Sequence, residues 1–244
     1  MKIEIFPGPQ PSNQAAADCL ARWLTATGTK TLMVAAGNTP LELYRLIALR
    51  SLPLAHLNVF ALDDYVGVPA DDPRTCANLL RLSVAEAWKI PPGQFHAVSS
   101  VEAEALASVK EHERQIASLG GLDVIVLGLG QNGHLGFNEP GSAPDSVGRL
   151  VNLEPSSVAA NRAWFGGDYA PSRGVTVGLK TILAAKRILI LAYGKHKTDP
   201  VADMVHGPRS ERCPASWLQD HADVRVFLDE SSAARLKPDI RQPR

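Results

Sequence analysis

Short apolar segments alternate along the chain with longer segments whose apolar residues recur every three or four positions. Short apolar segments rich in Val, Ile and Leu predict buried strands, and the longer spacing predicts amphipathic helices. The predicted strands cover residues 2–6, 29–36, 57–62, 122–129, 187–194 and 223–229. The predicted helices cover residues 14–27, 39–49, 75–88 and 102–119. In the second of these helices, we expect Thr39 as the N-cap and Pro40 at the first helical position.

This alternation predicts an α/β fold in which a mostly parallel sheet is covered by helices on both faces. Because the chain shows no internal repeat and no linker, we expect a single three-layer, Rossmann-like domain over residues 1–244. Residues 141–172 are rich in Pro, Ser and Gly, and we expect them to form a mobile flap.

The composition narrows the class of partner. Lys+Arg and Asp+Glu each number 25, so the formal net charge is zero, and binding to nucleic acid or a membrane through bulk positive charge is not expected. The three cysteines are far apart and predict neither a disulfide framework nor a metal site. The N-terminus lacks the apolar region of a signal peptide, and no apolar run approaches the roughly 20 residues of a membrane span. We therefore expect a cytoplasmic protein.

Polar clusters follow four of the predicted strands. In a parallel α/β sheet, ligands bind beyond the carboxyl ends of the strands, and all four clusters are predicted to lie at that edge. The clusters are AAGNTP at 35–40, LDDYVG at 62–67, GLGQNGHLGFNEP at 128–140 and AYGKHK at 192–197.

The first cluster combines a tight turn with the start of a helix. Gly37 and Asn38 permit the turn, and Thr39 opens a helix whose free N–H groups can hold an anion. An ATP-type phosphate loop is not indicated, because the pattern GxxxxGK[ST] is absent. A phosphate monoester also needs a cation, which Lys195 or Lys197 of the fourth cluster can supply.

The second cluster places two carboxylates, Asp63 and Asp64, directly after a buried strand. Neighbouring residues of an extended segment point to opposite faces, so one carboxylate can face a cleft while the other binds backbone or solvent. A carboxylate at a strand end beside apolar groups can have a raised pKa and transfer protons. Asp63 is therefore the candidate base, while an ordinary turn explains Asp64 equally well.

The third cluster surrounds His134 with glycines, which allow the backbone to approach a ligand closely. If the loop curls back, the Glu139 carboxylate can accept a hydrogen bond from the imidazole, fix its tautomer and raise its basicity. Asn132 lies beside this pair in the sequence. The loop therefore predicts a general acid or base built on His134.

Two other kinds of site are not supported. A serine hydrolase is not indicated, because no GxSxG pattern is present. The segment GLGQNG matches the dinucleotide pattern GxGxxG, but it follows a late strand, and no acidic residue ends a strand about twenty residues further on. We therefore do not expect a dinucleotide cofactor.

Nearly the whole chain resembles the glucosamine-6-phosphate deaminase (isomerase) family, which is related to the 6-phosphogluconolactonases. The resemblance rests on five segments in order: GNTPLELY, LDDYVG, LGLGQNGHLGFNEPG, VTVGLKTIL and LAYGKHK. The lactonases typically carry a GxDGHTASLFP-like loop and a DER-like sequence where this chain has DDY. Both positions here are similar to the deaminases.

The resemblance implies that a 2-amino-2-deoxyhexose 6-phosphate, here glucosamine 6-phosphate, is converted to fructose 6-phosphate and ammonia. On the matching positions, Asp63 is expected to move a proton between C2 and C1. His134 is expected to open the sugar ring, and Glu139 to orient His134. Each step is a proton transfer between positioned groups, so no metal or organic cofactor is expected.

The resemblance also implies where the phosphate binds. The expected residues are those of the GNTP turn together with one lysine, namely Gly37, Asn38, Thr39 and Lys197. The family often has a phosphate-binding arginine in an ANxRFF-like segment. This chain reads AANRAWF, so Arg162 stands one position early, and Arg173 is a second candidate.

The catalytic segments depart from the family pattern at two positions. Some members have an aspartate where this chain has Asn132, and others have an asparagine there as well. An asparagine cannot act as a base, but it can hydrogen-bond a sugar hydroxyl or His134. Asp64 replaces a glutamate that is common after the base.

Other functions stay open. The substrate could be galactosamine 6-phosphate, or the reaction could be lactone hydrolysis. A non-catalytic sugar-phosphate sensor is a further alternative, although Asp63, His134 and Glu139 favour catalysis, and no helix-turn-helix segment is expected before residue 1 or after residue 244. A small phosphorylated amino sugar is the expected partner, and the chain could form a homo-oligomer.

Some family members are activated by an N-acetylated amino-sugar phosphate that binds between subunits. The corresponding segment here, residues 141–153, has Arg149 as its only cation. A phosphate at an interface normally needs several cations or helix N-termini. We therefore expect hyperbolic kinetics and no response to N-acetylglucosamine 6-phosphate.

Overall fold

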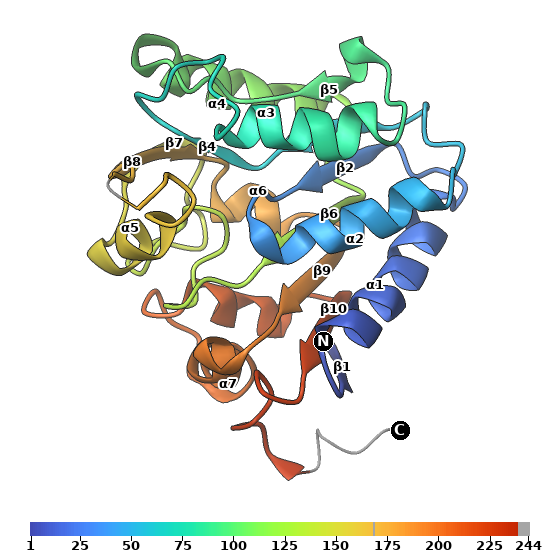
Figure 1. The fold of residues 1–244 in the computed structure, drawn as a ribbon, viewed down its shortest axis with the longest axis vertical. Helices are drawn as coiled ribbons and strands as arrows, with labels where there is room; N and C mark the ends of the chain where they lie inside the picture. The colour runs from blue at the N-terminus through green and yellow to red at the C-terminus, as the bar shows by residue number, and fades with distance from the viewer. Residues whose placement is uncertain (168, 239–244) are drawn as a thin grey trace.

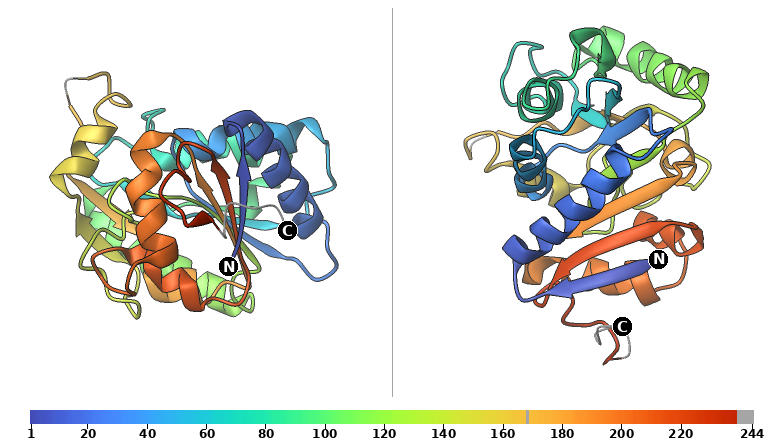
Figure 2. Two further views of the ribbon diagram at one scale, coloured as in Figure 1. Left: turned by 90° about the horizontal axis from the view of Figure 1, so that it is seen from below. Right: turned by 90° about the vertical axis from the view of Figure 1, so that its right-hand side faces the viewer.

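A computed structural model describes residues 1–167 and 169–238, and its central feature is a seven-stranded sheet (Figure 1). All neighbouring strands of this sheet pair in parallel, which confirms the predicted mostly parallel arrangement. The spatial order is β1 (Lys2–Phe6), β10 (Val224–Asp229), β9 (Arg187–Ala192), β6 (Val124–Gly128), β2 (Thr31–Val34), β3 (Asn58–Ala61) and β5 (Phe95–His96). The first strand therefore lies at one edge, beside the last strand (Figure 2).

The central strands are buried on both faces, which explains why they read as continuous apolar runs. In β6, Val124 and Val126 pack against the helices of one face, whereas Ile125 and Leu127 pack against those of the other. Successive side chains of a strand alternate between faces, so a strand covered on both sides needs apolar residues at every position.

Helices cover both faces of the sheet, as predicted. One face is covered by α1 (Pro9–Leu24), α2 (Asn38–Leu49) and the π-helical segment η1 (Arg81–Glu86). The other is covered by α4 (Glu102–Ser118), α6 (Leu179–Leu183), α7 (Thr198–His206) and the 3-10 segment η4 (Pro214–Asp220). Figure 1 shows α1 and α2 side by side on their face. No helix in residues 1–167 or 169–238 is both long and apolar enough to cross a membrane.

A second, three-stranded sheet lies next to the first and is antiparallel. Its order is β4 (Asp63–Tyr65), β8 (Arg173–Thr176) and β7 (Arg149–Asn152). The chain passes from one sheet to the other at Leu62, whose N–H donates to Val34 and whose carbonyl accepts from Val177. The apolar run at 57–62 is therefore followed at once by a strand of a different sheet, which its continuous pattern does not reveal.

Part of the predicted flap has regular structure. Residues 141–172 contain β7 and the helix α5 (Pro155–Asn161). Strand β7 pairs with β8 along its whole length, so this part of the segment is joined to the second sheet. The mobility of the segment stays a prediction.

Two predicted helices differ in detail from those observed. Helix α2 begins at Asn38 with Gly37 as its N-cap, so the predictions of Thr39 as N-cap and of Pro40 as the first helical residue are wrong. Gly37 has a φ of 100°, a conformation that favours glycine, and it turns the chain into the helix earlier. The predicted helix at 75–88 is divided into α3 (Cys76–Leu80), capped by the Thr75 side chain, and η1. Two short 3-10 segments, η2 (Pro92–Gln94) and η3 (Lys195–Lys197), complete the described elements.

Candidate active site

A pocket of about 320 Å³ lies at the carboxyl ends of β2, β6 and β9. All four of the polar clusters predicted at this edge contribute residues to its wall. It therefore brings together Asp63, His134, Lys197 and the turn at Gly37, which are far apart in the sequence. Helix α5 and the residues after it form another part of the wall.

Asp63 is the first residue of β4 and lines the pocket, although only 5% of its surface is exposed. Burial and the neighbouring Asp64 charge raise the pKa of Asp63 to about 7, while a hydrogen bond from the Cys76 side chain acts in the opposite direction. A carboxyl group whose pKa lies near neutral pH can both accept and return a proton. This is the environment that the sequence predicts for the base.

Asp64 points the other way and has a structural role. Its carboxylate accepts hydrogen bonds from the backbone N–H groups of Tyr65, Cys76 and Ala77, at 2.8–2.9 Å. Burial raises the pKa of Asp64 to about 6, and these three donors limit the rise. Asp64 thus fixes the start of α3 against β4, while its neighbour faces the pocket.

The glycine-rich loop after β6 brings His134 to Glu139. The imidazole Nδ1 lies 3.2 Å from Glu139 Oε2, and Asn132 Nδ2 donates to the same oxygen at 2.7 Å. Because a carboxylate only accepts, His134 carries its proton on Nδ1, and Nε2 is the nitrogen free to act as a base. His134 lines the pocket, whereas Asn132 and Glu139 lie behind it.

Glu139 is buried and remains the negative partner of this group. Burial alone raises the pKa of Glu139, but hydrogen bonds from His134, Ser157 and Asn132 lower it more, so the net shift is downward. The backbone N–H of His134 donates to Asn132 Oδ1 at 3.3 Å, which holds the asparagine in the same turn. The arrangement can therefore hold one tautomer of His134 and stabilise its protonated form.

The turn before α2 and the turn before α7 meet at the other end of the pocket. Gly37, Asn38 and Thr39 all line it, and α2 starts there without a side-chain cap. Lys197 also lines it, and its Nζ donates to the Leu129 carbonyl at 2.5 Å. Burial lowers the pKa of Lys197 to about 8. A free helix N-terminus beside a lysine is suited to an anion.

Lys195 does not line the pocket, so of the two lysines only Lys197 is brought to it. The two arginines considered for the phosphate lie outside it as well. Arg162 is exposed at the C-cap of α5, and Arg173 is paired with Glu102 on the surface. The residues of α5 and of the turn after it that line the pocket recur at helical spacing, and they are Ser157, Ala160, Asn161 and Trp164, together with Ser156 and Ala163. Residue 162 falls on the opposite face of this helical arrangement.

Several pocket residues were not predicted from the sequence. The clearest are Arg74, Cys76, Trp164 and His196. Arg74 and Cys76 follow the same predicted strand as Asp63 and flank the capping residue of α3, so the helix start in DDPRTCAN was the available signal. Within the described part of the chain, no group of three or more His, Cys, Asp or Glu side chains is placed to hold a metal ion.

Known proteins are similar to this chain over most of its length. The family model described as glucosamine-6-phosphate isomerases/6-phosphogluconolactonase matches residues 10–227. A glucosamine-6-phosphate deaminase of Cutibacterium acnes is 38% identical over 241 residues, which cover 97% of this chain and 92% of that protein. One of Streptococcus gordonii is 37% identical over 212 residues, covering 86% and 89%.

Solved structures show the same similarity. A structure described as a monomeric glucosamine-6-phosphate deaminase matches with a TM-score of 0.91 and 31% identity, covering 96% of this chain and 99% of that one. The 6-phosphogluconolactonase of Trypanosoma brucei matches with a TM-score of 0.79 and 22% identity, covering 97% and 98%. The latter similarity concerns the fold.

Proposed function

Because the chain belongs to the family of glucosamine-6-phosphate isomerases and 6-phosphogluconolactonases, we propose that it converts glucosamine 6-phosphate to fructose 6-phosphate and ammonia. The observation that carries this proposal is the joint position of two proton-transfer groups on one pocket. Asp63, with a pKa of about 7, and His134, held by Glu139, both line it. Such a pair suits a reaction made of successive proton transfers.

Ring opening is the step assigned to His134. Nε2 of the imidazole takes the proton from the O1 hydroxyl of the cyclic sugar and delivers it to the ring oxygen O5, as the C1–O5 bond breaks and the C1 carbonyl forms. Between these two transfers the imidazole of His134 is positively charged, and the Glu139 carboxylate stabilises that charge. Asn132 holds Glu139 in place through its 2.7 Å hydrogen bond.

Isomerisation is assigned to the ionised form of Asp63. The carboxylate takes the proton from C2 while the C1 carbonyl oxygen takes a proton from the ammonium group on C2, which gives an enediol-type intermediate with a neutral amino group on C2. Asp63 then returns its proton to C1, and C2 becomes an iminium carbon. Water adds at C2, ammonia leaves, and the ketose remains. These steps require no metal or organic cofactor.

Substrate binding is assigned to the opposite end of the pocket. The N-terminus of α2 at Gly37, Asn38 and Thr39, together with Lys197, is the proposed site of the 6-phosphate. A bound phosphate dianion would also favour the charged form of Lys197, whose pKa burial lowers. Arg162 is not part of the proposed phosphate site, because its side chain is exposed outside the pocket.

The proposal extends to the setting of the enzyme. A phosphorylated amino sugar is its small-molecule partner, and a cytoplasmic location fits such a metabolite. The solved deaminase structure reported above is described as monomeric, and a homo-oligomer of this chain stays a prediction that light scattering can test.

One assay panel tests the activity. Purified protein is given glucosamine 6-phosphate, galactosamine 6-phosphate or 6-phosphogluconolactone, and ammonia release or lactone hydrolysis is measured. We expect ammonia from the first substrate, loss of that activity in Asp63→Asn, and full activity in Asp71→Asn, which changes an exposed aspartate of the following loop. Lactone hydrolysis without ammonia release would contradict the proposal, and a preference for the galacto substrate would change its specificity.

A further inference from the structure

Arg74 is a cationic residue of the pocket wall that the proposed function leaves without a role. Of the described residues that line the pocket, Arg74 and Lys197 are those with an arginine or lysine side chain. His196 also lines it, but burial and the Lys197 charge lower its pKa, which favours the neutral imidazole. A phosphate dianion in this pocket would therefore meet Arg74 and Lys197 as its main positive partners.

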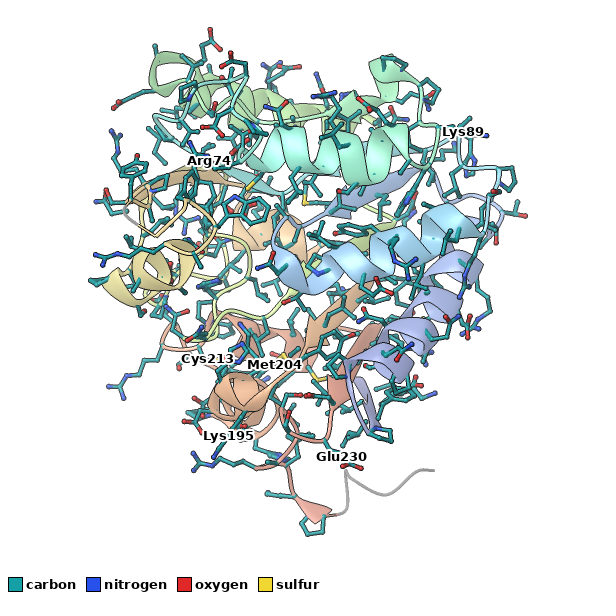
Figure 3. All side chains as sticks on the ribbon, viewed as in Figure 1. Arg74, Lys89, Lys195, Met204, Cys213 and Glu230 are labelled. Atoms are coloured by element: carbon teal, nitrogen blue, oxygen red, sulfur yellow. The ribbon has the colours of Figure 1, made fainter. Side chains whose placement is uncertain are left out.

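The two cations reach the pocket from different parts of the fold. Lys197 follows β9, α2 follows β2, and Arg74 follows β3 and β4. In the sheet, β2 lies between β9 and β3, so the strand that leads into α2 lies between β9, which leads to Lys197, and β3, which comes before β4 and Arg74. Lys195, which does not line the pocket, lies in Figure 3 near α7, far from Arg74.

Contacts with the flap hold Arg74 at the wall of the pocket. The guanidinium carbon lies 5.1 Å from the centre of the Phe165 ring, and the Arg74 carbonyl accepts from Trp164 Nε1 at 2.9 Å. Phe165 belongs to a small apolar cluster against which Ala36 packs, and Ala36 directly precedes Gly37. The guanidinium thus lies against Phe165, whose cluster also contacts the residue before the α2 turn.

The guanidinium of Arg74 has N–H donors that its hydrogen bonds to Asp72 do not use. Its hydrogen bonds to Asp72 use Nε and Nη2, at 2.6–3.2 Å. Within residues 1–167 and 169–238, no hydrogen bond from Nη1 is formed. An arginine has five N–H donors in a planar fork that matches phosphate oxygens, so one edge can be held by Asp72 while another binds an anion.

From this arrangement we propose that Arg74 is a second cation of the phosphate site and contacts the 6-phosphate together with Lys197. This inference rests on the proposed function. The family often has its phosphate-binding arginine in the ANxRFF-like segment of the flap. In this chain Ala163 lines the pocket there and Arg162 does not, so the proposal gives the role of phosphate-binding arginine to Arg74, in the loop before α3. Asp72 and Phe165 then act as positioning residues, because they hold the guanidinium over the pocket.

The competing explanation is that Arg74 only braces the flap through Asp72, Phe165 and Trp164. In that case, its replacement would loosen the flap and reduce kcat or thermal stability, while a small anion would bind as before. Anion binding and KM therefore distinguish phosphate binding by Arg74 from a purely structural role. Loss of a structural contact should leave the affinity for inorganic phosphate unchanged.

The test compares Arg74→Gln and Arg74→Lys with wild type and with Arg162→Gln, which removes an exposed arginine of the same flap. Inorganic phosphate is titrated calorimetrically at constant ionic strength, and kcat, KM and the unfolding midpoint are measured. Since charge-assisted hydrogen bonds are the strong ones, we expect Arg74→Gln to weaken phosphate binding and raise KM about tenfold, with kcat within about threefold. Arg74→Lys should lie between, and Arg162→Gln should match wild type.

Unchanged phosphate affinity in Arg74→Gln would overturn the inference, and so would an equal loss in Arg162→Gln. If Arg74→Gln unfolds early, the Arg74→Lys variant decides, because it retains a charge and must bind phosphate more tightly than Arg74→Gln under conditions where both are folded. Absence of ammonia release by the wild type would contradict the proposed function alone, since the phosphate titration still reports on Arg74.

Discussion

Asp63 and Asp64 are adjacent carboxylates whose surroundings give them different chemistry. Three backbone N–H groups hold Asp64, whereas Asp63 lies against the pocket with the Cys76 side chain as its hydrogen-bond donor. The charge of Asp64 raises the pKa of Asp63 further. The structural carboxylate therefore helps to tune the proposed base, which agrees with the alternation of faces expected for an extended segment.

The first prediction concerns Asp63→Asn. Loss of a positioned base should reduce turnover by about 10²–10⁴-fold. The same change should stabilise the fold at higher pH. A carboxyl group whose folded pKa is raised favours folding most below its unfolded pKa, near 4, and loses that contribution as the pH rises through about 7.

Urea unfolding at pH 5 and pH 8 measures this second effect. Since the folded pKa of Asp63 is about 7, the variant should gain roughly 2–3 kcal/mol relative to wild type between these two pH values. Asp71→Asn, in the exposed loop, serves as the control and should show no such difference. Equal stability differences at both pH values would show that Asp63 is not held in its neutral form.

The second prediction concerns Glu139→Gln. An amide in place of the carboxylate can no longer stabilise a protonated His134, and it can present an N–H₂ group to Nδ1 and reverse the tautomer. Turnover should fall about 10–100-fold, as for other residues that act through a ligand or catalytic group. The pH–rate profile should also move, because the imidazole has lost the carboxylate that pairs with it.

A matched control is Glu211→Gln, which changes an exposed glutamate. Ammonia release is measured from pH 5 to 9 for both variants. A loss of turnover with an unmoved profile would mean that Glu139 supports the loop but does not act through His134.

At the scale of elements, the glycine-rich loop after β6 is shaped around the imidazole. A Cβ on Gly130 would lie 2.3 Å from the ring carbons of His134, closer than any non-bonded contact allows. The Gly130 N–H meanwhile donates to the His134 carbonyl at 2.9 Å, so the two residues close a tight turn. The spacing of glycine and histidine in GLGQNGH thus has a direct steric cause.

The third prediction is that Gly130→Ala displaces His134 and reduces turnover at least about tenfold, since small displacements of catalytic groups are costly. Gly93→Ala is the control, because a Cβ there meets nothing within 4 Å and the φ of Gly93 is not positive. Ammonia release and circular dichroism are compared for both variants. Wild-type turnover in Gly130→Ala would mean that the ring position is not tightly set.

The elements also show which parts of the structure the sequence could predict. The strands of the main sheet follow from apolar runs such as Val124–Gly128, because burial on both faces leaves a local signal. The second sheet leaves none, since β4 pairs with β8 about one hundred residues later and its strands have three or four residues. Arg74 was missed for the same reason, because its place in the pocket depends on contacts with the distant flap.

At the scale of the whole molecule, Arg149 bears on regulation. Its guanidinium donates from Nη1 to Asn138 Oδ1 and from Nη2 to Ser142 Oγ, each at 2.8 Å, so both Nη atoms already serve the chain's own fold. The fourth prediction is therefore that the rate depends hyperbolically on glucosamine 6-phosphate and that N-acetylglucosamine 6-phosphate has no effect. Initial rates with and without the acetylated compound test it. A sigmoidal curve that becomes hyperbolic on its addition would contradict the prediction.

Burial of titratable groups also makes the stability of the whole fold depend on pH. His112 of α4 is 3% exposed, and its Nε2 donates to the Ala61 carbonyl of β3 at 2.8 Å. Its ring also meets Phe60 edge-on, with ring centres 4.9 Å apart. Burial lowers the pKa of His112 to about 4. His112 therefore joins helix and sheet as a neutral group, and its effect on stability is opposite in sign to that of Asp63.

The last prediction follows from that sign. An unfolded chain takes up a proton on His112 near pH 6.5, whereas the folded protein does so only near pH 4, so acid favours unfolding between these values. A shift of this size corresponds to roughly 3 kcal/mol. Asp63 and Asp64 titrate in the same range, which hides the effect in wild type alone. His112→Gln keeps a donor for Ala61 and the same acidic groups, so the difference in unfolding free energy between the two proteins isolates it. That difference, measured with urea, should move in favour of the variant as the pH falls from 6.5 to 4, and a constant difference would show that His112 is not held neutral by the fold.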